Sequence, residues 1–195
     1  RAPETPLNLP IGTHRRVLWI DAELAELKEI KNSLGGTVND VFLAIVSGAL
    51  SNWLRGRGVR TEGLELRGAV PVSVRTEDEQ GELGNKITIM VGRLPTYCRD
   101  PVERLHIVSE GMRHLKESKQ AMGAEAIARV EDFAPPTIFA RASRLHFSSR
   151  LYNLLVTNVP GPQFPLYLLG RELEDFIPVA FLAPNQALAV AIVSY

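Results

Sequence analysis

One segment, from Thr37 to Gly56, constrains the fold of this chain of 195 residues more than any other. Its apolar residues recur at helical spacing on nearly every side: Val41, Phe42, Leu43, Ile45, Val46, Leu50, Trp53 and Leu54. A helix that is apolar all round is normally buried, because no face of it suits water. Thr37 is a favourable N-cap residue, and Gly56 is expected to end the helix. The segment therefore predicts a buried central helix around which the rest of the chain packs.

Two amphipathic helices are also predicted. The first covers residues 22–34, with Asp21 as its N-cap and Gly35-Gly36 at its end. The second begins at Asp100, with Pro101 at the first helical position. Its apolar stripe consists of Leu105, Val108, Met112 and Leu115. Weaker helical patterns cover residues 121–130 and begin again at residue 135.

Strands are predicted where β-branched and aromatic residues gather or alternate with polar ones. They cover residues 15–20, 66–75, 86–94, 151–159, 166–169, 176–181 and 186–194. Pro71 must lie at an end, an edge or a bulge of its strand, since it has no N–H for a ladder. Strands and helices interleave along the chain, which is typical of α/β folds. We expect a two-layer α/β sandwich with a mixed β-sheet covered by helices on one face.

The composition is that of an ordinary globular protein without a strongly charged partner surface. Lys+Arg and Asp+Glu each number 22, so the net charge is zero, which argues against a nucleic-acid partner. The single cysteine, Cys98, cannot form an intrachain disulfide, and no Cys/His cluster indicates a zinc site. Charges or prolines interrupt every apolar run, so no membrane span is predicted. We expect one large domain, with two small domains as the alternative, in a reducing, cytoplasmic setting.

The two ends of the chain predict that it is a fragment. Residues 1–13 are rich in proline and have no initiator Met, as expected of an interdomain linker. The apolar run 187–195 has the pattern of a strand that no turn has yet closed. We expect residues 1–13 to be a linker from a missing N-terminal domain. Residues 14–195 would then be a C-terminal domain, truncated at its C-terminal end.

The sequence contains no self-contained catalytic motif. There is no G-x-G-x-x-G loop, no P-loop and no G-x-S-x-G nucleophile turn. Four histidines are scattered along the chain: His14, His106, His114 and His146. A surface or packing role is expected for each of them. Cys98 is either a reactive thiol near a helix start or an inert small hydrophobe, and the second role is the commoner one.

Asn39 and Asp40 are the most informative polar residues, because they open the most apolar helix. Burying such groups is costly unless they are hydrogen-bonded. In the simpler interpretation they cap the helix and compensate its dipole. In the alternative interpretation they brace a neighbouring loop or a partner domain.

Two further groups of polar residues lie at predicted strand ends. Thr157 and Asn158 precede a rigid Pro-Gly-Pro turn, where they either present polar groups at a cleft or bond to their own backbone. The other group consists of Ser73, Arg75, Asn85 and Lys86. Arg75 or Lys86 would contact a phosphate group of a ligand, or would remain a solvated charge at a strand end, which is the commoner case.

Taken in order, four segments resemble a known family. They are Thr37-Val38-Asn39-Asp40-Val41, Pro71-Val72-Ser73-Val74-Arg75, Leu83-Gly84-Asn85-Lys86 and Thr157-Asn158-Val159-Pro160-Gly161-Pro162. From Thr13 onward the chain resembles the C-terminal domain of bacterial wax ester synthase/diacylglycerol acyltransferases. The resemblance implies one half of a CoA-dependent, chloramphenicol-acetyltransferase-like fold with its active site in a tunnel between the halves. It also implies transfer of a long-chain acyl group from acyl-CoA to diacylglycerol or a fatty alcohol, giving triacylglycerol or wax ester.

The resemblance gives this chain supporting roles rather than catalytic ones. The family's general base lies in a His-His-x-x-x-Asp-Gly motif of the N-terminal half, and this sequence has no adjacent histidine pair. We therefore expect no catalytic residue in this fragment and no activity from it alone. Asn39 and Asp40 match the family's Asn-Asp motif, which implies that they hold the tunnel and the histidine loop in place. Candidates for facing the tunnel are Thr157, Asn158, Ser73, Arg75 and Asn85. Phe42, Leu43, Ile45 and Val46 are candidates for its apolar wall, although core packing explains them equally well.

Partners and location rest on the resemblance alone. It implies three partners: the N-terminal domain of the same polypeptide, acyl-CoA, and a diacylglycerol or long-chain alcohol. Acyl-CoA is a substrate, and no metal or prosthetic group is required. We expect a cytoplasmic location, peripheral to the inner membrane or to lipid inclusions. Two alternatives stay open: an acyltransferase of the same fold with a different acceptor, and a non-catalytic binding module.

Overall fold

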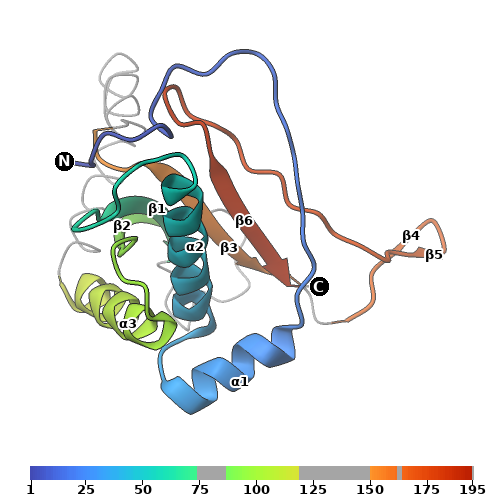
Figure 1. Ribbon diagram of the computed structural model, residues 1–195. Helices are drawn as coiled ribbons and strands as arrows, with labels where there is room; N and C mark the ends of the chain where they lie inside the picture. The colour runs from blue at the N-terminus through green and yellow to red at the C-terminus, as the bar shows by residue number, and fades with distance from the viewer. Residues whose placement is uncertain (74–86, 119–149, 162–163, 195) are drawn as a thin grey trace, which may run out of the picture.

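The computed structural model describes residues 1–73, 87–118, 150–161 and 164–194. Its helices are α1 (Leu24–Leu34), α2 (Val38–Arg55) and α3 (Pro101–Glu117). Its strands are β1 (Leu66–Ser73), β2 (Ile87–Leu94), β3 (Leu154–Pro160), β4 (Tyr167–Leu168), β5 (Arg171–Glu172) and β6 (Ala189–Ser194). Figure 1 shows β1, β2, β3 and β6 as a central sheet, with α2 and α3 packed against it and the β4–β5 hairpin projecting from the body.

The sheet is mixed, as the sequence predicts. Its strand order is β2-β1-β3-β6, with β1 antiparallel to β2 and with β3 parallel to both β1 and β6. The backbone N–H and C=O of Arg67 both form hydrogen bonds with Asn153, just before β3. Because backbone groups alternate in direction along a strand, the nitrogen of Pro71, four residues later, also faces β3. The ladder between β1 and β3 covers Gly68 and Ala69, so Pro71 lies beyond it. Its missing N–H therefore costs no bond in that ladder.

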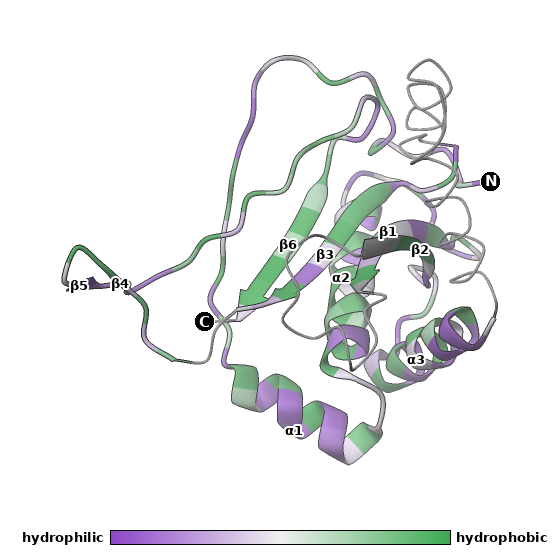
Figure 2. Cartoon of the chain, turned by 180° about the vertical axis from the view of Figure 1, so that it is seen from behind, coloured by the Kyte–Doolittle hydropathy of each residue, from purple (hydrophilic) through white to green (hydrophobic). Residues whose placement is uncertain are grey.

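The main core fills the space between the sheet and the helices. Leu66 and Val70 of β1, together with Leu154 and Val156 of β3, pack there against α2 and α3. The buried residues of α2 are Asp40, Val41, Leu43, Ala44, Val46, Ser47, Gly48, Leu50, Ser51 and Leu54. Those of α3 are Leu105, Val108 and Met112. Figure 2 shows the resulting contrast between the apolar strands β3 and β6 and the amphipathic helices α1 and α3. The predictions of a buried central helix and of helices covering a mixed sheet are confirmed.

The first eight residues are tied to the domain through buried Asn153. The side-chain amide of Asn153 donates to the carbonyl oxygen of Pro3 and to Oδ1 of Asn8, each at 2.7 Å. The backbone N–H of Ala187 donates to the carbonyl oxygen of Leu7 at 2.8 Å. This segment therefore packs against the starts of β1 and β3 and against the chain leading into β6.

Two predicted strands are wrong. Residues 15–20 are extended and exposed, and they pair with no described strand. β-Branched and aromatic residues favour a strand only where a neighbouring strand is available. Residues 176–181 also form no strand within the described part of the chain, and Pro178 removes a backbone donor from the middle of that segment.

Two local details also differ from prediction, and two predicted helices cannot be compared. Glu23, rather than Asp21, occupies the N-cap of α1, and it makes no side-chain capping bond. The sequence predicted no strand at β5, which pairs with β4. The helical patterns at 121–130 and from 135 onward lie outside the described residues.

The described helices include no single one that is long and apolar enough to cross a membrane. α1 and α2 pass such a test of length and composition only as a pair, and they meet at an angle of 100°.

Candidate functional site

The turn between α1 and α2 bends the chain by 100° at a pair of glycines. Gly35 ends α1, and its N–H donates to the carbonyl oxygen of Lys31 at 2.9 Å. Gly35 and Gly36 have φ angles of +86° and +83°, in the left-handed region that glycine occupies without strain. The prediction that this pair ends α1 is confirmed, and the pair also aims the start of α2.

Thr37 and Asp40 close the start of α2 with two reciprocal hydrogen bonds. The backbone N–H of Asp40 donates to Oγ1 of Thr37 at 3.2 Å, and the backbone N–H of Thr37 donates to Oδ2 of Asp40 at 2.8 Å. These bonds satisfy two donors that a helix start leaves free, and they place a carboxylate at the positive end of the helix dipole. Asp40 is only 4% exposed. The capping interpretation of Asp40 is thus confirmed, while its bracing of a partner stays a prediction.

The second carboxylate oxygen of Asp40 takes no part in the capping box. Within the described part of the chain, neither Oδ1 of Asp40 nor the hydroxyl of Ser109 on α3 has a hydrogen-bond partner, although both atoms are buried. Both side chains lie against Gly36, where a Cβ atom would be 2.5 Å from Ser109 Oγ and 3.3 Å from Asp40 Oδ2. Buried polar atoms without partners are rare and unfavourable. The turn is therefore suited to accept a donor from a further group.

Sequence reasoning identified Asp40 but missed Ser109. Asp40 was conspicuous because a carboxylate at the start of an apolar helix requires an explanation. Ser109 lies within the amphipathic helix α3, where a serine gives no signal of its own. Only the approach of α3 to the α1–α2 turn reveals its position.

Asn39 and the four proposed wall residues occupy different environments on α2. The side chain of Asn39 is half-buried in the first turn of the helix. Leu43 and Val46 are buried in the core, and Phe42 packs partly against it. Ile45 is 48% exposed. Core packing thus accounts for Leu43 and Val46, whereas Ile45 is open to a contact outside the described residues.

The polar strand-end residues lie at the end of the sheet where α2 begins. β1, β3 and β6 run parallel, so their carboxyl ends meet there (Figure 1). Ser73 is the last residue of β1, and Thr157 and Asn158 lie near the end of β3. Alternation puts Asn158 on the face of Leu154 and Val156, toward α2, and Thr157 on the opposite face. Both are half-buried.

Three predicted polar residues, Arg75, Asn85 and Lys86, lie outside the described residues. The structure therefore brings Ser73, Thr157 and Asn158 to the end of the fold that holds Asp40, and a tunnel there stays a prediction.

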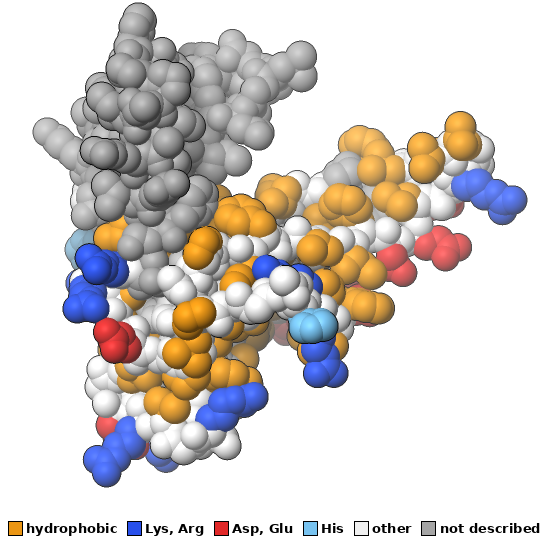
Figure 3. All heavy atoms as spheres, turned by 90° about the horizontal axis from the view of Figure 1, so that it is seen from above, with side chains coloured by type: hydrophobic (Ala, Val, Ile, Leu, Met, Phe, Trp, Pro, Cys, Tyr) orange, Lys and Arg blue, Asp and Glu red, His pale blue; other side chains and the backbone are white. Residues whose placement is uncertain are grey.

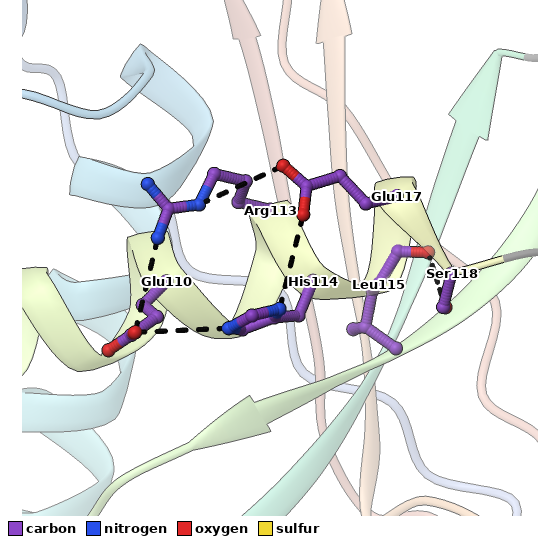
Figure 4. Close-up of polar contacts among 6 residues, drawn as sticks. All are labelled: Glu110, Arg113, His114, Leu115, Glu117 and Ser118. Carbon is purple, nitrogen blue, oxygen red and sulfur yellow. Dashed lines mark hydrogen bonds and ion pairs between the residues drawn. The ribbon is translucent and has the colours of Figure 1, made fainter.

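The described histidines form no catalytic arrangement with one another. His14 and His106 are exposed. On the outer face of α3, the ring nitrogens of His114 lie 3.8 Å from Oε1 of Glu110 and 4.0 Å from Oε2 of Glu117 (Figure 4). The guanidinium of Arg113 lies 3.9 Å and 4.0 Å from carboxylate oxygens of the same two residues. Exposed ion pairs of this kind contribute little to stability. Among the described residues no group of three His, Cys, Asp or Glu side chains is placed to hold a metal ion.

Cys98 has the character of an inert thiol. It is buried, and its Sγ lies 3.4 Å from the carbonyl oxygen of Asp100. Burial, followed by the negative charge of Glu103, raises the pKa of this thiol above its ordinary value. Because the thiolate is the nucleophilic form, Cys98 is a poor candidate for covalent catalysis at neutral pH.

An open groove of about 400 Å³ lies where the N-terminal segment meets the chain before β6. It is lined by Pro10, Ile11, Arg15, Leu182, Pro184 and Asn185. Arg15 already donates to the carbonyl oxygens of Gly12 and His14. The groove brings together residues about 170 positions apart in sequence, which no local pattern could predict.

Known relatives match the whole chain. A putative diacylglycerol O-acyltransferase of Mycobacterium tuberculosis is 35% identical over 99% of the chain, which covers 39% of that relative. The O-acyltransferase WSD of Acinetobacter baylyi is 31% identical over 100% of the chain, which covers 42% of it. The wax ester synthase/diacylglycerol acyltransferase of Marinobacter aquaeolei VT8 superposes on all of the chain, and on 44% of its own chain, with a TM-score of 0.73 and 27% identity. The chain thus spans about two fifths of the length of these relatives.

Two family models match different parts of the chain. The model of the wax ester synthase/diacylglycerol acyltransferase catalytic domain matches residues 1–42. The model of the C-terminal domain of the same family matches residues 83–195, which is more than half of the chain. The first match ends within α2, just after Asn39 and Asp40. The chain belongs to the wax ester synthase/diacylglycerol acyltransferase family.

Proposed function

We propose that this chain is the C-terminal half of an O-acyltransferase that transfers a long-chain acyl group from acyl-CoA to diacylglycerol or to a fatty alcohol. The observation that carries the proposal is the match of residues 1–42 to the catalytic-domain model, because those residues include the turn that buries Asp40. Relatives named diacylglycerol O-acyltransferases match nearly all of the chain and support the same reaction. The products are triacylglycerol or wax ester.

In the proposed reaction, the general base is a histidine of a preceding half of the polypeptide. It takes the proton of the acceptor hydroxyl, whose oxygen attacks the thioester carbonyl carbon of acyl-CoA. Collapse of the tetrahedral intermediate expels the thiolate of CoA, which takes up that proton. Hydrogen-bond donors near the carbonyl oxygen stabilise the developing negative charge. Ser73, Thr157, Asn158, Arg75 and Asn85 are the proposed contributors from this chain to the tunnel.

Asp40 is proposed as a positioning residue. One carboxylate oxygen is fixed by the backbone N–H of Thr37, while the other is buried without a partner among the described residues. In the proposed enzyme, a group of the preceding half donates a hydrogen bond to that oxygen and so holds the histidine loop against α2. Half-buried Asn39 lies beside Asp40 and shares this role. Neither residue transfers a proton.

The partners and location of the whole protein are part of the same proposal. The chain acts with its N-terminal half, acyl-CoA and a lipid acceptor, in the cytoplasm next to the inner membrane or to lipid inclusions. Because acyl-CoA is soluble and the acceptors are lipids, the enzyme works where the two substrates meet.

The test is acyl transfer by the chain joined to the preceding sequence of its parent protein. Palmitoyl-CoA is the donor, dioleoylglycerol and hexadecanol are the acceptors, and the products are identified by mass spectrometry. We expect triacylglycerol or wax ester. A folded joined protein that binds palmitoyl-CoA but yields neither product would contradict the proposal and favour a binding module. Transfer only to another class of hydroxyl compound would contradict the proposed acceptor.

The role of Asp40 is tested in the joined protein with Asp40→Asn. We expect kcat to fall about tenfold or more, while KM for palmitoyl-CoA changes little, because a positioning defect acts on the chemical step. The matched control is Asp100→Asn, since Asp100 caps the exposed start of α3 through Val102 and Glu103. Equal losses from both variants would indicate a purely structural role for Asp40.

A further inference from the structure

Ser109, on the core-facing side of α3, has a hydroxyl that the proposed reaction leaves unexplained. It lies one helical turn from Leu105 and from Met112, which both pack in the core. Its hydroxyl oxygen is buried and has no hydrogen-bond partner among the described residues. Figure 3 shows charged side chains at the surface of the molecule, where water can bond to them. The hydroxyl of Ser109 lacks that access, so its position has to be explained by a partner inside the protein.

The hydroxyl of Ser109 is directed away from its own helix. A serine in a helix commonly donates to the carbonyl oxygen four residues earlier, as Ser47 of α2 does to Leu43 at 2.8 Å. Ser109 makes no such bond. From the Cβ position of Gly36, Oγ of Ser109 is 2.5 Å away and the Ser109 Cβ atom is 3.4 Å away. The hydroxyl therefore points from α3 toward the turn between α1 and α2.

Asp40 brings the complementary atom to the same place. Its Oδ2 lies 3.3 Å from the Cβ position of Gly36 and accepts from the backbone N–H of Thr37 at 2.8 Å. Its Oδ1 is buried and has no partner within the described part of the chain. Ser109 thus has a proton to donate, Asp40 has an oxygen to accept it, and both side chains lie against one glycine. A rotation about the Cα–Cβ bond of Ser109, or one shared water, is enough to join them.

Gly36 permits this approach, because a Cβ atom there would take the space that the Ser109 hydroxyl enters. A hydrogen bond to a carboxylate is stronger than one between neutral groups, and burial strengthens it further. One contact therefore accounts for the glycine at 36, the free oxygen of Asp40 and the unusual direction of Ser109.

We propose that Ser109 is a second positioning residue for acyl transfer, whose hydroxyl donates to the carboxylate of Asp40 and orients it before the two halves of the enzyme meet. This inference rests on the proposed function, in which Asp40 holds the histidine loop. A carboxylate oxygen accepts two hydrogen bonds, so Ser109 and the group of the preceding half do not compete. Through this side chain, α3 helps to set the geometry of the reaction site.

The sign of a stability change in the chain tests the contact itself. If Ser109 donates to Asp40, Ser109→Ala leaves a buried carboxylate oxygen unpaired, and the urea midpoint should fall. If the hydroxyl has no partner, alanine removes a buried polar atom and improves helix propensity, so the midpoint should rise. Ser33→Ala, at an exposed position of α1, measures the propensity effect alone and should raise the midpoint slightly. A rise for Ser109→Ala overturns the proposal.

A double-mutant cycle identifies Asp40 as the partner. Ser109→Ala combined with Asp40→Ala should lower the free energy of unfolding by less than the sum of the two single losses, because both remove the same bond. The control cycle pairs Asp40→Ala with Ser47→Ala, whose hydroxyl is bonded to Leu43, and its effects should be additive. Additive effects of Ser109→Ala and Asp40→Ala overturn the proposal.

Acyl transfer by the joined protein tests the positioning role. Ser109→Ala should lower kcat about threefold or more with little change in KM for palmitoyl-CoA, and its effect on kcat should be smaller when Asp40→Asn is already present. Ser47→Ala is the matched control, since it also removes a buried hydroxyl, and it should leave kcat unchanged. Equal losses of kcat in Ser109→Ala and Ser47→Ala would assign the loss to stability and overturn the positioning role.

The outcomes separate this inference from the proposed function. A joined protein that transfers acyl groups equally fast with and without Ser109→Ala overturns the positioning role and leaves the function standing. Coupling between Ser109 and Asp40 in a joined protein that transfers no acyl group supports the contact and contradicts the function.

Discussion

The side-chain amide of Asn153 donates a hydrogen bond to the carbonyl oxygen of Pro3 at 2.7 Å, although 150 positions separate the two residues. The side-chain oxygen of Asn153 accepts from the backbone N–H of Arg67 at 2.9 Å, and the residue is fully buried. One side chain therefore joins the N-terminal segment to the starts of β1 and β3.

Asn153→Ala should lower the free energy of unfolding by roughly 2–4 kcal/mol, because it leaves at least two polar groups of the backbone without partners. Urea unfolding of the chain, followed by circular dichroism, measures the loss. Asn52→Ala, at an exposed position on α2, is the control and should change stability by less than about 0.5 kcal/mol. Similar losses from both variants would contradict the role given to Asn153.

From the structure of the α1–α2 turn we predict that alanine lowers the free energy of unfolding by different amounts at Gly35 and Gly36. Gly35→Ala should cost about 1–2 kcal/mol from the left-handed backbone alone, since nothing lies within 4 Å of its Cβ position. Gly36→Ala should cost more, because its Cβ would also lie 2.5 Å from Ser109 Oγ. Adding Ser109→Ala should recover most of this extra loss but not all of it, because Asp40 Oδ2 still lies 3.3 Å from the Cβ position of residue 36. A double-mutant cycle from urea unfolding measures this coupling. If the effect of the double variant equals the sum of the effects of the two single variants, the packing described here is contradicted.

Gly48 and Gly111 lie within helices, yet alanine should have opposite effects at the two positions. Arg104 crosses Gly48 to donate to the carbonyl oxygens of Ala44 at 2.9 Å and Cys98 at 3.0 Å. A Cβ at Gly48 would lie 2.6 Å from the Arg104 guanidinium, so Gly48→Ala should cost about 1–3 kcal/mol. Gly111→Ala meets nothing within 4 Å and should stabilise α3 by about 0.5–1 kcal/mol. Melting temperatures should shift in opposite directions, and shifts of the same sign would count against this account.

Elements of the fold could be predicted where residues close together in the sequence determine them, and could not where contacts between distant residues do. The starts of α2 and α3 were predicted correctly because Thr37, Asp100 and Pro101 act within one helical turn of their own positions. The strand expected at 15–20 was wrong because its composition cannot tell whether a partner strand lies beside it. Asn153 gave no signal at all, since its bonds span 86 to 150 positions.

The same distinction applies to the candidate site. Asp40 could be identified because a carboxylate at the start of an apolar helix is chemically unusual in its own segment. Ser109 could not, since its role depends on how α3 packs against the α1–α2 turn. Local chemistry thus predicted the polar start of α2, and only the assembled structure showed what surrounds it.

Tyr152 should make stability depend on pH in the alkaline range. Burial raises the pKa of its hydroxyl above the ordinary value of 10.0, with a smaller opposing effect from the hydrogen bond to Gln186. The folded chain then keeps this proton at a pH where the unfolded chain has lost it. The stabilising effect of protonated Tyr152 on the free energy of unfolding is therefore complete below the pKa of the unfolded chain. It is lost as pH rises through the pKa of the folded chain.

We expect the free energy of unfolding of the parent chain to fall more steeply above about pH 10 than that of Tyr152→Phe. Urea unfolding at a series of pH values from about 8 to 11 measures the two slopes. Tyr167→Phe, on exposed β4, is the control and should retain the steep fall. Parallel curves for Tyr152→Phe and the parent chain would show that Tyr152 ionises without unfolding cost.

The most direct test of the central claim is acyl transfer from palmitoyl-CoA to dioleoylglycerol, measured for this chain alone and for the same chain joined to its preceding sequence. The proposed function predicts no turnover by the chain alone and turnover by the joined protein. Turnover by the folded chain alone would contradict the account, because it would place the catalytic groups within these 195 residues.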